Sequence, residues 1–151
     1  MNSLLFLFVI INHIIEFYAI YKRDSDFLVA ADSLVVVPGV MTAGKPTTLA
    51  EAHHMFEIFS KQPFLVVTGV FLYCTSTKQS ETYYSLTTLT MKPTNTEERT
   101  VIFEKVTPLD KAGGFSLLYS PELFPIVEGS RSNVTGLPLE TLPEHMQRLR
   151  K

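Results

Sequence analysis

The apolar positions of this chain gather into short runs of strand length, and polar turn residues separate these runs. Strands are predicted at residues 27–37, 40–43, 63–74, 81–91 and 123–127. The first run is almost wholly apolar, which predicts a strand buried on both faces, and the third run predicts a second buried strand. The dipeptide Pro38-Gly39 favours a tight turn, so the first two strands are predicted to form a hairpin.

Three further segments have the residue pattern of helices, and two of them begin with a capping signal. Helices are predicted at residues 48–61, 94–106 and 138–151. Thr48 and Glu51 have the spacing of a capping box, and Thr94-Asn95-Thr96-Glu97 has the composition of a helix start. The sequence contains neither an internal repeat nor a low-complexity linker.

A carboxylate interrupts the first predicted strand. Residues 27–37 read FLVAADSLVVV, with Asp32 and Ser33 near the middle. A buried carboxylate without a partner is costly, so Asp32 must be compensated. Two interpretations stay open: nearby backbone amides satisfy a strand-end carboxylate, or the strand opens there into a cleft where Asp32 meets a cation or a metal.

Two loops carry lysines suited to binding anions. Lys45 lies in Gly44-Lys45-Pro46, just before a predicted helix whose N-terminal backbone N–H groups favour an anion. Considered alone, Lys45 fits a solvated loop residue better, because this motif is too short to be specific. Lys111 lies in the glycine-bearing loop 108–115, next to Asp110.

Residues 4–20 form the longest apolar run, LLFLFVIINHIIEFYAI. The run is close to membrane-span length, but Asn12, His13 and Glu16 interrupt it. A signal peptide fits less well, because no positive charge precedes the run and no small-residue cleavage site follows it. We predict a buried or partner-covered helix, with a membrane span as the alternative.

Length and composition fit one globular domain. The chain has 151 residues, of which 46% are hydrophobic and 19% are charged. A net charge of -2, without a stripe of lysine and arginine, argues against nucleic-acid binding. The single cysteine, Cys74, has no internal partner, and the His and Cys residues lack metal-ligand spacing. This cysteine usage predicts a reducing compartment, the cytoplasm.

Five segments, taken in chain order, carry the most specific pattern in the sequence. They are Ala30-Ala31-Asp32, Gly44-Lys45-Pro46, Val67-Thr68-Gly69-Val70 after Ser60, and the segments 108–113 and 128–138. Together they resemble the Maf family of nucleoside triphosphate pyrophosphatases, over about residues 26–142. The resemblance implies an α/β fold with a mixed, twisted sheet and flanking helices, shared with the inosine-triphosphate pyrophosphatases. It divides the chain into an atypical apolar segment, 1–25, and a Maf-like domain, 26–151.

The resemblance also implies a reaction. A modified or pyrimidine nucleoside triphosphate would be hydrolysed to the monophosphate and pyrophosphate, with a divalent metal, Mg²⁺ or Mn²⁺. Asp32 corresponds to the catalytic carboxylate, a general base that can act through a metal it helps to hold. Lys45 and Lys111 would bind the polyphosphate. Asp110 would orient its loop, Asn133 would either fix its own loop or contact the ligand, and the family implies a homodimer.

Three departures from the family pattern bear on function. Nothing in residues 1–26 matches the family's opening strand and Ser-x-x-Arg-Arg phosphate loop, so either the chain is N-terminally shortened or its start differs from that of the family. Leu118 stands where the family carries Gln, and Phe64 stands where a His is usual, so base recognition loses hydrogen-bond partners. Ser33 replaces the usual Thr after the catalytic Asp and keeps the hydroxyl. Ser33 and Leu118 are therefore predicted specificity positions.

Two functions stay open at this stage. The first is a working pyrophosphatase, with dTTP and UTP favoured because DKAGGF and EGSRSNV look nearer that branch of the family. The second is a truncated relative that binds nucleotides but is catalytically weak or inactive. A membrane-tethered variant, through residues 4–20, is a third interpretation.

Overall fold

The computed structural model describes residues 26–151. The helix predicted within residues 4–20 and the segment 1–25 lie outside the described residues. In chain order the elements are β1 Phe27–Val37, β2 Met41–Ala43, α2 Leu49–Phe59, β3 Phe64–Cys74, β4 Ser80–Leu89, α3 Thr96–Val106, the 3-10 turns η1 Pro108–Asp110 and η2 Ala112–Gly114, β5 Ile126–Glu128, α4 Arg131–Val134 and α5 Leu142–Leu149.

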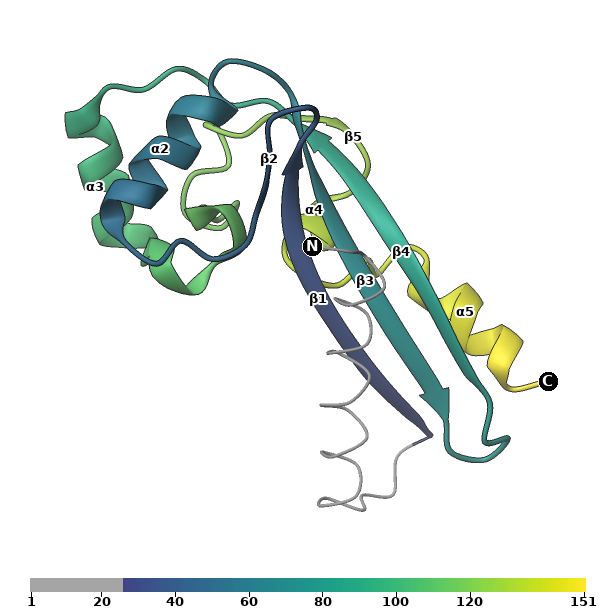
Figure 1. The fold of residues 1–151 in the computed structure, drawn as a ribbon. Helices are drawn as coiled ribbons and strands as arrows, with labels where there is room; N and C mark the ends of the chain where they lie inside the picture. The colour runs from purple at the N-terminus through teal and green to yellow at the C-terminus, as the bar shows by residue number, and fades with distance from the viewer. Residues whose placement is uncertain (1–25) are drawn as a thin grey trace.

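The strands form one sheet in the order β2-β1-β3-β4-β5, and every pair in the described part of the chain is antiparallel. Three long strands, β1, β3 and β4, extend away from the lobe that contains α2 and α3 (Figure 1). The helices α2 and α3 gather at one end of these strands, and α5 lies along the other end (Figure 1). The predicted α/β class with flanking helices is confirmed, as is the β1–β2 hairpin.

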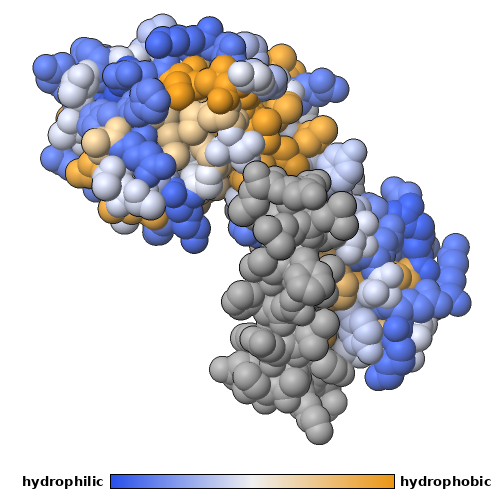
Figure 2. Space-filling view, in the orientation of Figure 1, coloured by the Kyte–Doolittle hydropathy of each residue, from blue (hydrophilic) through white to orange (hydrophobic). Residues whose placement is uncertain are grey.

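Two clusters of buried side chains hold the two ends of the sheet. The larger cluster fills the space between α2, α3, the 115–124 segment and the adjoining end of the sheet, and six phenylalanines dominate it: Phe56, Phe59, Phe64, Phe103, Phe115 and Phe124. The smaller cluster lies under α5 and contains Val70, Leu72, Cys74 and Leu149. We call the part of the molecule around α2 and α3 the helical lobe. In the space-filling view hydrophilic residues cover the outer side of this lobe, and hydrophobic residues gather where it adjoins the sheet (Figure 2).

The prediction that the first strand is buried on both faces was wrong. In β1 only Val35 and Val37 are buried, and the half before them is exposed or half-buried. Along that half β1 pairs with β3 alone among the described elements, because β2 begins its pairing at Val35. An apolar run shows that burial is favourable, but only neighbouring elements supply it. By contrast, β3 is buried on one face throughout and forms the centre of the sheet.

The predicted helix starts are confirmed by their caps. The Thr48 hydroxyl accepts from the Glu51 amide at the start of α2, and Asn95 forms a complete capping box with Glu98 at the start of α3. The Glu51 carboxylate turns to the backbone amide of Thr47 instead of to Thr48, at 2.7 Å. This amide holds the pKa of Glu51 below its usual value.

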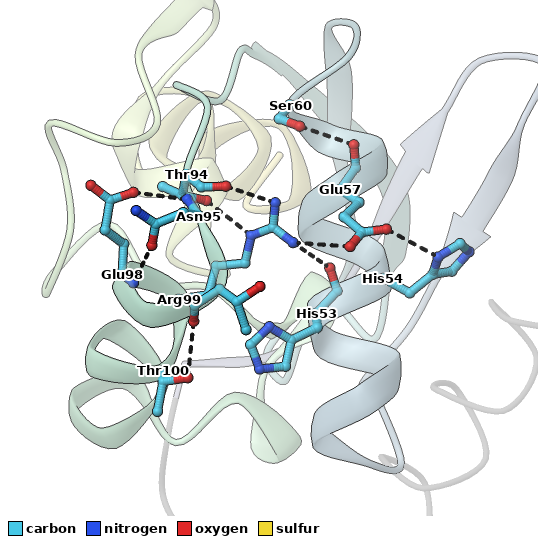
Figure 3. A network of polar contacts seen from close by, with 10 residues as sticks. His53, His54, Glu57, Ser60, Thr94, Asn95, Glu98, Arg99 and Thr100 are labelled. Carbon is cyan, nitrogen blue, oxygen red and sulfur yellow. Dashed lines mark hydrogen bonds and ion pairs between the residues drawn. The ribbon is translucent and has the colours of Figure 1, made fainter.

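A buried arginine ties the two helices of the lobe together. Arg99 of α3 donates to both oxygens of Thr94, to the His53 carbonyl of α2 and to the Glu57 carboxylate (Figure 3). Four acceptors compensate for burying the guanidinium of Arg99, a residue that is 7% exposed. The lobe that carries the Lys45 loop is thereby fixed to the segment that leads to Lys111.

The C-terminal elements depart from their predicted bounds. The last strand is three residues long and lies later than expected, the polar loop 128–136 contains the one-turn helix α4, and α5 begins at Leu142. Short segments of this kind take their conformation from the elements on which they pack. In residues 26–151 no helix is both long and apolar enough to cross a membrane.

Candidate active site

A cleft of about 320 Å³ lies where the exposed edge of β1 meets the two lysine loops and the segment after α4. All five predicted site residues line it: Asp32, Ser33, Lys45, Lys111 and Leu118. They come from two stretches of the sequence, residues 32–45 and 111–118. The sheet and the helical lobe bring these two stretches together.

Asp32 is exposed to this cleft. One carboxylate oxygen, Oδ1, accepts from the backbone amide of Ser33 at 2.8 Å. Its partner across the ladder is Gly69 of β3, which adds no side chain beside it. Both open interpretations therefore hold in part: a neighbouring amide orients the carboxylate, and the strand borders a cleft at this point.

The two lysine loops are joined directly to each other. The Gly113 amide donates to the Gly44 carbonyl at 2.9 Å, next to Lys45. Gly113 has a φ of +69°, and a Cβ there would come within 2.8 Å of Val35 Cγ2. A residue without a side chain is needed for this close approach of the loop to β1. The glycine thus brings Lys111 to the same edge of the sheet as Lys45.

Lys111 forms an ion pair with its neighbour. Its Nζ lies 2.6 Å from Asp110 Oδ1. The hydrogen bond from Lys111, with a further contribution from the charge of Lys45, holds the pKa of Asp110 below its usual value. The effect of Lys45 on Asp110 indicates that both ammonium groups contribute positive potential to one region.

Ser33 lies on the face of the sheet that α4 covers. Its Oγ is 2.8 Å from Thr68 Oγ1 of β3, and the Thr68 hydroxyl donates to the Asn133 carbonyl of α4 at 3.0 Å. Thr68 is fully buried. A chain of hydroxyl groups therefore links β1 through β3 to α4.

Asn133 has the structural role that was one of its two predicted alternatives. It is fully buried, and its Nδ2 donates to the Val66 carbonyl at 3.2 Å and to Thr87 Oγ1 at 2.9 Å. Thr87 also exchanges hydrogen bonds with the backbone of Ser130. These bonds fix the segment from Gly129 to Asn133 onto β3 and β4, and they set the position of the cleft wall that follows it.

The far wall of the cleft is mainly apolar. Phe115, Leu117 and Val134 line it together with Leu118, whose side chain is 70% exposed. Phe64, in contrast, does not line the cleft; it is fully buried and stacks on Phe59 with ring centroids 4.5 Å apart. The prediction that Phe64 removes a base contact was wrong, because its ring completes the core.

The donor set of the cleft suits a metal that is shared with a ligand. The described residues contain no cluster of three His, Cys, Asp or Glu side chains able to hold a metal by themselves. Asp32 is the carboxylate that lines the cleft in this part of the chain. Mg²⁺ is commonly bound by one or two carboxylates together with phosphate oxygens and water. Asp32 therefore fits a divalent metal that arrives with a polyphosphate.

Sequence reasoning did not assign Thr68, Thr87 or Gly129 to the site's support. Gly129 has a φ of +102°, and a Cβ there would lie 2.6 Å from the Leu86 carbonyl and from Thr87 Oγ1. The available signal for Thr68 and Gly129 was their place within the motif segments. Nothing local marked Thr87, because a threonine in an alternating strand is unremarkable before its cross-sheet partners are known.

A comparison with protein families bears directly on this arrangement. The sequence pattern of the family described as "Maf-like protein" matches residues 12–149, most of the chain. The chain belongs to the Maf-like family. The five motif segments lie within the matched range, so the predicted family membership is confirmed.

Relatives with assigned names point to one kind of activity. The dTTP/UTP pyrophosphatase of Porphyromonas gingivalis strain ATCC 33277 is 36% identical over 123 residues, which cover 80% of this chain and 60% of the relative. The proteins of that name from Methanosarcina barkeri and Staphylothermus marinus are 32% and 26% identical, and cover 83% and 82% of this chain. The chain spans about three fifths of the length of the relatives it matches, 60% for the last of these.

Proposed function

We propose that this Maf-like protein is a nucleoside triphosphate pyrophosphatase, which hydrolyses its substrate to the nucleoside monophosphate and pyrophosphate. The observation that carries the proposal is the convergence of Asp32, Lys45 and Lys111 on one cleft. A carboxylate beside two ammonium groups provides a base and a counter-charge, which are the two requirements for attack of water on a polyphosphate.

In this mechanism water attacks the α-phosphorus and Asp32 accepts the proton that the water loses. The bond between the α-phosphorus and the α,β-bridging oxygen breaks, and pyrophosphate leaves with the electron pair of that bond. Lys45 and Lys111 stabilise the charge that develops on the leaving group. The Asp110 carboxylate keeps the Lys111 ammonium in place through their 2.6 Å contact.

A divalent metal, Mg²⁺ or Mn²⁺, would be held by Asp32 and by phosphate oxygens. When bound, such an ion polarises the phosphoryl oxygens and neutralises part of their charge. The same carboxylate lies beside the Ser33 amide, which fixes its orientation at 2.8 Å. This contact occupies Oδ1, so Oδ2 is the oxygen that would take the metal or the proton.

We propose dTTP and UTP as the preferred substrates, because relatives at 26–36% identity carry the name dTTP/UTP pyrophosphatase. The apolar wall of Phe115, Leu117 and Leu118 can pack against a base. Leu118 offers no hydrogen bond to the polar edge of the base, so discrimination among bases should be modest. We propose also that the protein acts in the cytoplasm, as its single buried cysteine favours, and as a homodimer, as the family resemblance implies.

The direct test is a panel of nucleoside triphosphates incubated with the protein and Mg²⁺ or Mn²⁺, with chromatographic measurement of monophosphate and pyrophosphate. We expect both products in equal amounts, with dTTP and UTP turned over faster than purine nucleotides. The Asp32→Asn protein serves as the control for contaminating hydrolases.

The alternative function, a nucleotide-binding relative with little or no catalysis, has its own supporting observation. In residues 26–151 the cationic side chains lining the cleft are Lys45 and Lys111, and Lys111 is already paired with Asp110. A triphosphate carries about four negative charges at neutral pH. Nucleotide binding without product, measured by calorimetry on the folded protein, would favour this alternative over the enzyme.

A further inference from the structure

The hydroxyl chain beneath the cleft has a defined direction. A carbonyl oxygen can only accept a hydrogen bond, so the Thr68 hydroxyl uses its single proton to donate to the Asn133 carbonyl, 3.0 Å away. The Thr68 oxygen is then the acceptor in its 2.8 Å contact with Ser33 Oγ. The Ser33 hydroxyl must therefore donate to Thr68, and its proton points away from the cleft.

This direction decides what Ser33 can offer to a ligand. With its proton committed to Thr68, Ser33 Oγ has only lone pairs for the cleft that it lines. It can accept from water or from a donor on a substrate, but it cannot donate to a phosphate oxygen. Ser33 stands next to Asp32, and the Ser33 amide holds the Asp32 carboxylate at 2.8 Å. Adjacent side chains of a strand leave it on opposite faces, but the bond to the Ser33 amide turns the Asp32 carboxylate towards Ser33, and both residues line the cleft.

We infer that Thr68 is a positioning residue, which holds Ser33 Oγ as a hydrogen-bond acceptor for the attacking water beside Asp32. This inference rests on the proposed pyrophosphatase function. The water would donate a hydrogen bond to Ser33 Oγ and transfer its other proton to Asp32, which leaves an oxygen lone pair free for phosphorus. Ser33 is thus assigned to orienting the nucleophile rather than to recognising the base.

Thr68 acts on the opposite wall of the cleft through the same hydroxyl. Its bond to the Asn133 carbonyl reaches the last turn of α4, and the residues that follow, Val134 to Gly136, line the cleft. Thr68 is fully buried, so its hydroxyl is a partner for Ser33 and Asn133 and not a ligand group itself. One buried side chain consequently sets the distance between the β1 edge and the α4 wall.

The test compares Thr68→Val, which is nearly isosteric but lacks the hydroxyl, with Thr68→Ser, which retains it. Turnover of dTTP is measured for these proteins, for Ser33→Ala and for the Ser33→Ala/Thr68→Val double variant. We expect Thr68→Val to lower kcat about tenfold with KM within about threefold, and Thr68→Ser to restore kcat. The kcat of the double variant should be no lower than that of Ser33→Ala alone, because Thr68 contributes to kcat through Ser33, whereas its bond to α4 sets the cleft wall and is measured by hydrogen exchange.

Losses that multiply in the double variant, or a Thr68→Ser protein as slow as Thr68→Val, would overturn the inference. Amide hydrogen exchange at residues 134–136 supplies a readout that needs no turnover. It should be faster in Thr68→Val than in the parent and unchanged in Thr68→Ser. If the parent protein hydrolysed no nucleotide, the proposed function would be refuted. The positioning of α4 by Thr68 has a separate test, because an amide exchange rate at residues 134–136 that is unchanged in Thr68→Val would refute it.

Discussion

At the scale of single residues, the environment of each site residue determines which chemistry it can support. Asp32 is open to the cleft and held by one amide, whereas Asn133, from a motif of the same family pattern, is fully buried among backbone groups of β3 and β4. Exposure leaves Asp32 able to exchange protons with a ligand. Burial confines Asn133 to fixing the chain.

Asp32→Asn should abolish hydrolysis and leave the free energy of unfolding nearly unchanged. The amide has almost the shape of the carboxylate but cannot take a proton from water. Asp26→Asn is the matched control, because Asp26 is an exposed carboxylate about 20 Å away along the same segment. Rates of pyrophosphate release and urea denaturation measure both quantities. Full turnover in Asp32→Asn would exclude this carboxylate as the base.

Lys45→Ala should raise KM for the triphosphate and lower kcat, because its charge meets both the bound polyphosphate and the leaving group. A combined loss in kcat/KM of about tenfold to a thousandfold is expected for one such cation. Lys61→Ala, which removes an exposed lysine just after α2, is the control. Steady-state kinetics equal to those of the parent would identify Lys45 as a solvated loop residue.

Lys111→Met should raise the pKa of Asp110 towards its usual value, because the hydrogen bond from Lys111 is the main cause of its lowering. Lys45→Ala should raise the same pKa less, since Lys45 acts only through its charge. A lowered carboxyl pKa stabilises the fold above the unfolded-state pKa, and this contribution is lost as pH falls through the folded-state pKa. Carbon-13 NMR titration measures the shift, and an unchanged pKa in Lys111→Met would contradict the ion pair.

At the scale of elements, the segment from Gly129 to Gly136 takes its conformation from the sheet. Thr87 of β4 bonds to Ser130 and Asn133, and the approach is close enough that Gly129 has no room for a Cβ. Its local sequence shows only a polar loop with two glycines. The packing of this loop on β3 and β4 produces the one-turn helix α4 and the cleft wall.

Gly129→Ala should destabilise the protein more than Gly136→Ala. Both glycines have a left-handed φ, +102° and +108°, so both substitutions bear a backbone cost of about 1–3 kcal/mol. Only at position 129 does the new Cβ meet a backbone carbonyl, at 2.6 Å, whereas nothing lies within 4 Å at position 136. The clash should add about 1–3 kcal/mol. Urea denaturation of the two proteins measures the difference in their free energies of unfolding. Equal losses of this free energy would show that the loop around position 129 moves to accommodate the Cβ.

At the scale of the whole molecule, two buried clusters lie at opposite ends of three long strands. The cleft lies on the edge of β1 between them, with Val35 of the larger cluster at its base. The smaller cluster depends on α5, which covers Val70, Leu72 and Cys74. Stability at the two ends should therefore be separable, because few buried contacts couple them.

Leu149→Ala should destabilise the α5 end by about 2 kcal/mol, the low end for a buried leucine, because α5 lies near the end of the described chain. Amide exchange should become faster in α5 and near Cys74 but stay unchanged in α2. Gln147→Ala, on the exposed side of the same helix, is the control. Faster exchange in α2 as well would mean that the two clusters unfold together.

The sequence predicted most of the elements and singled out residues that line the cleft, for identifiable reasons. Thr48 and Asn95 mark helix starts because their caps bond within one turn of chain. The long apolar run of β3 predicted the central strand because burial favours such runs wherever they occur. Asp32 stood out because a carboxylate is incompatible with a fully apolar neighbourhood.

Features that depend on a distant partner were decided by the tertiary structure alone. The burial of Phe64, the exposure of β1 around Asp32 and the length of the last strand each depend on which elements pack beside them. The hydroxyl chain from Ser33 through Thr68 to Asn133 joins residues up to 100 positions apart, since 133 minus 33 is 100. Caps and apolar runs are properties of neighbours in sequence, whereas hydrogen-bond partners and burial are properties of neighbours in space. The sequence by itself therefore determined the kinds of residue available for chemistry, and the folded chain determined which of them meet.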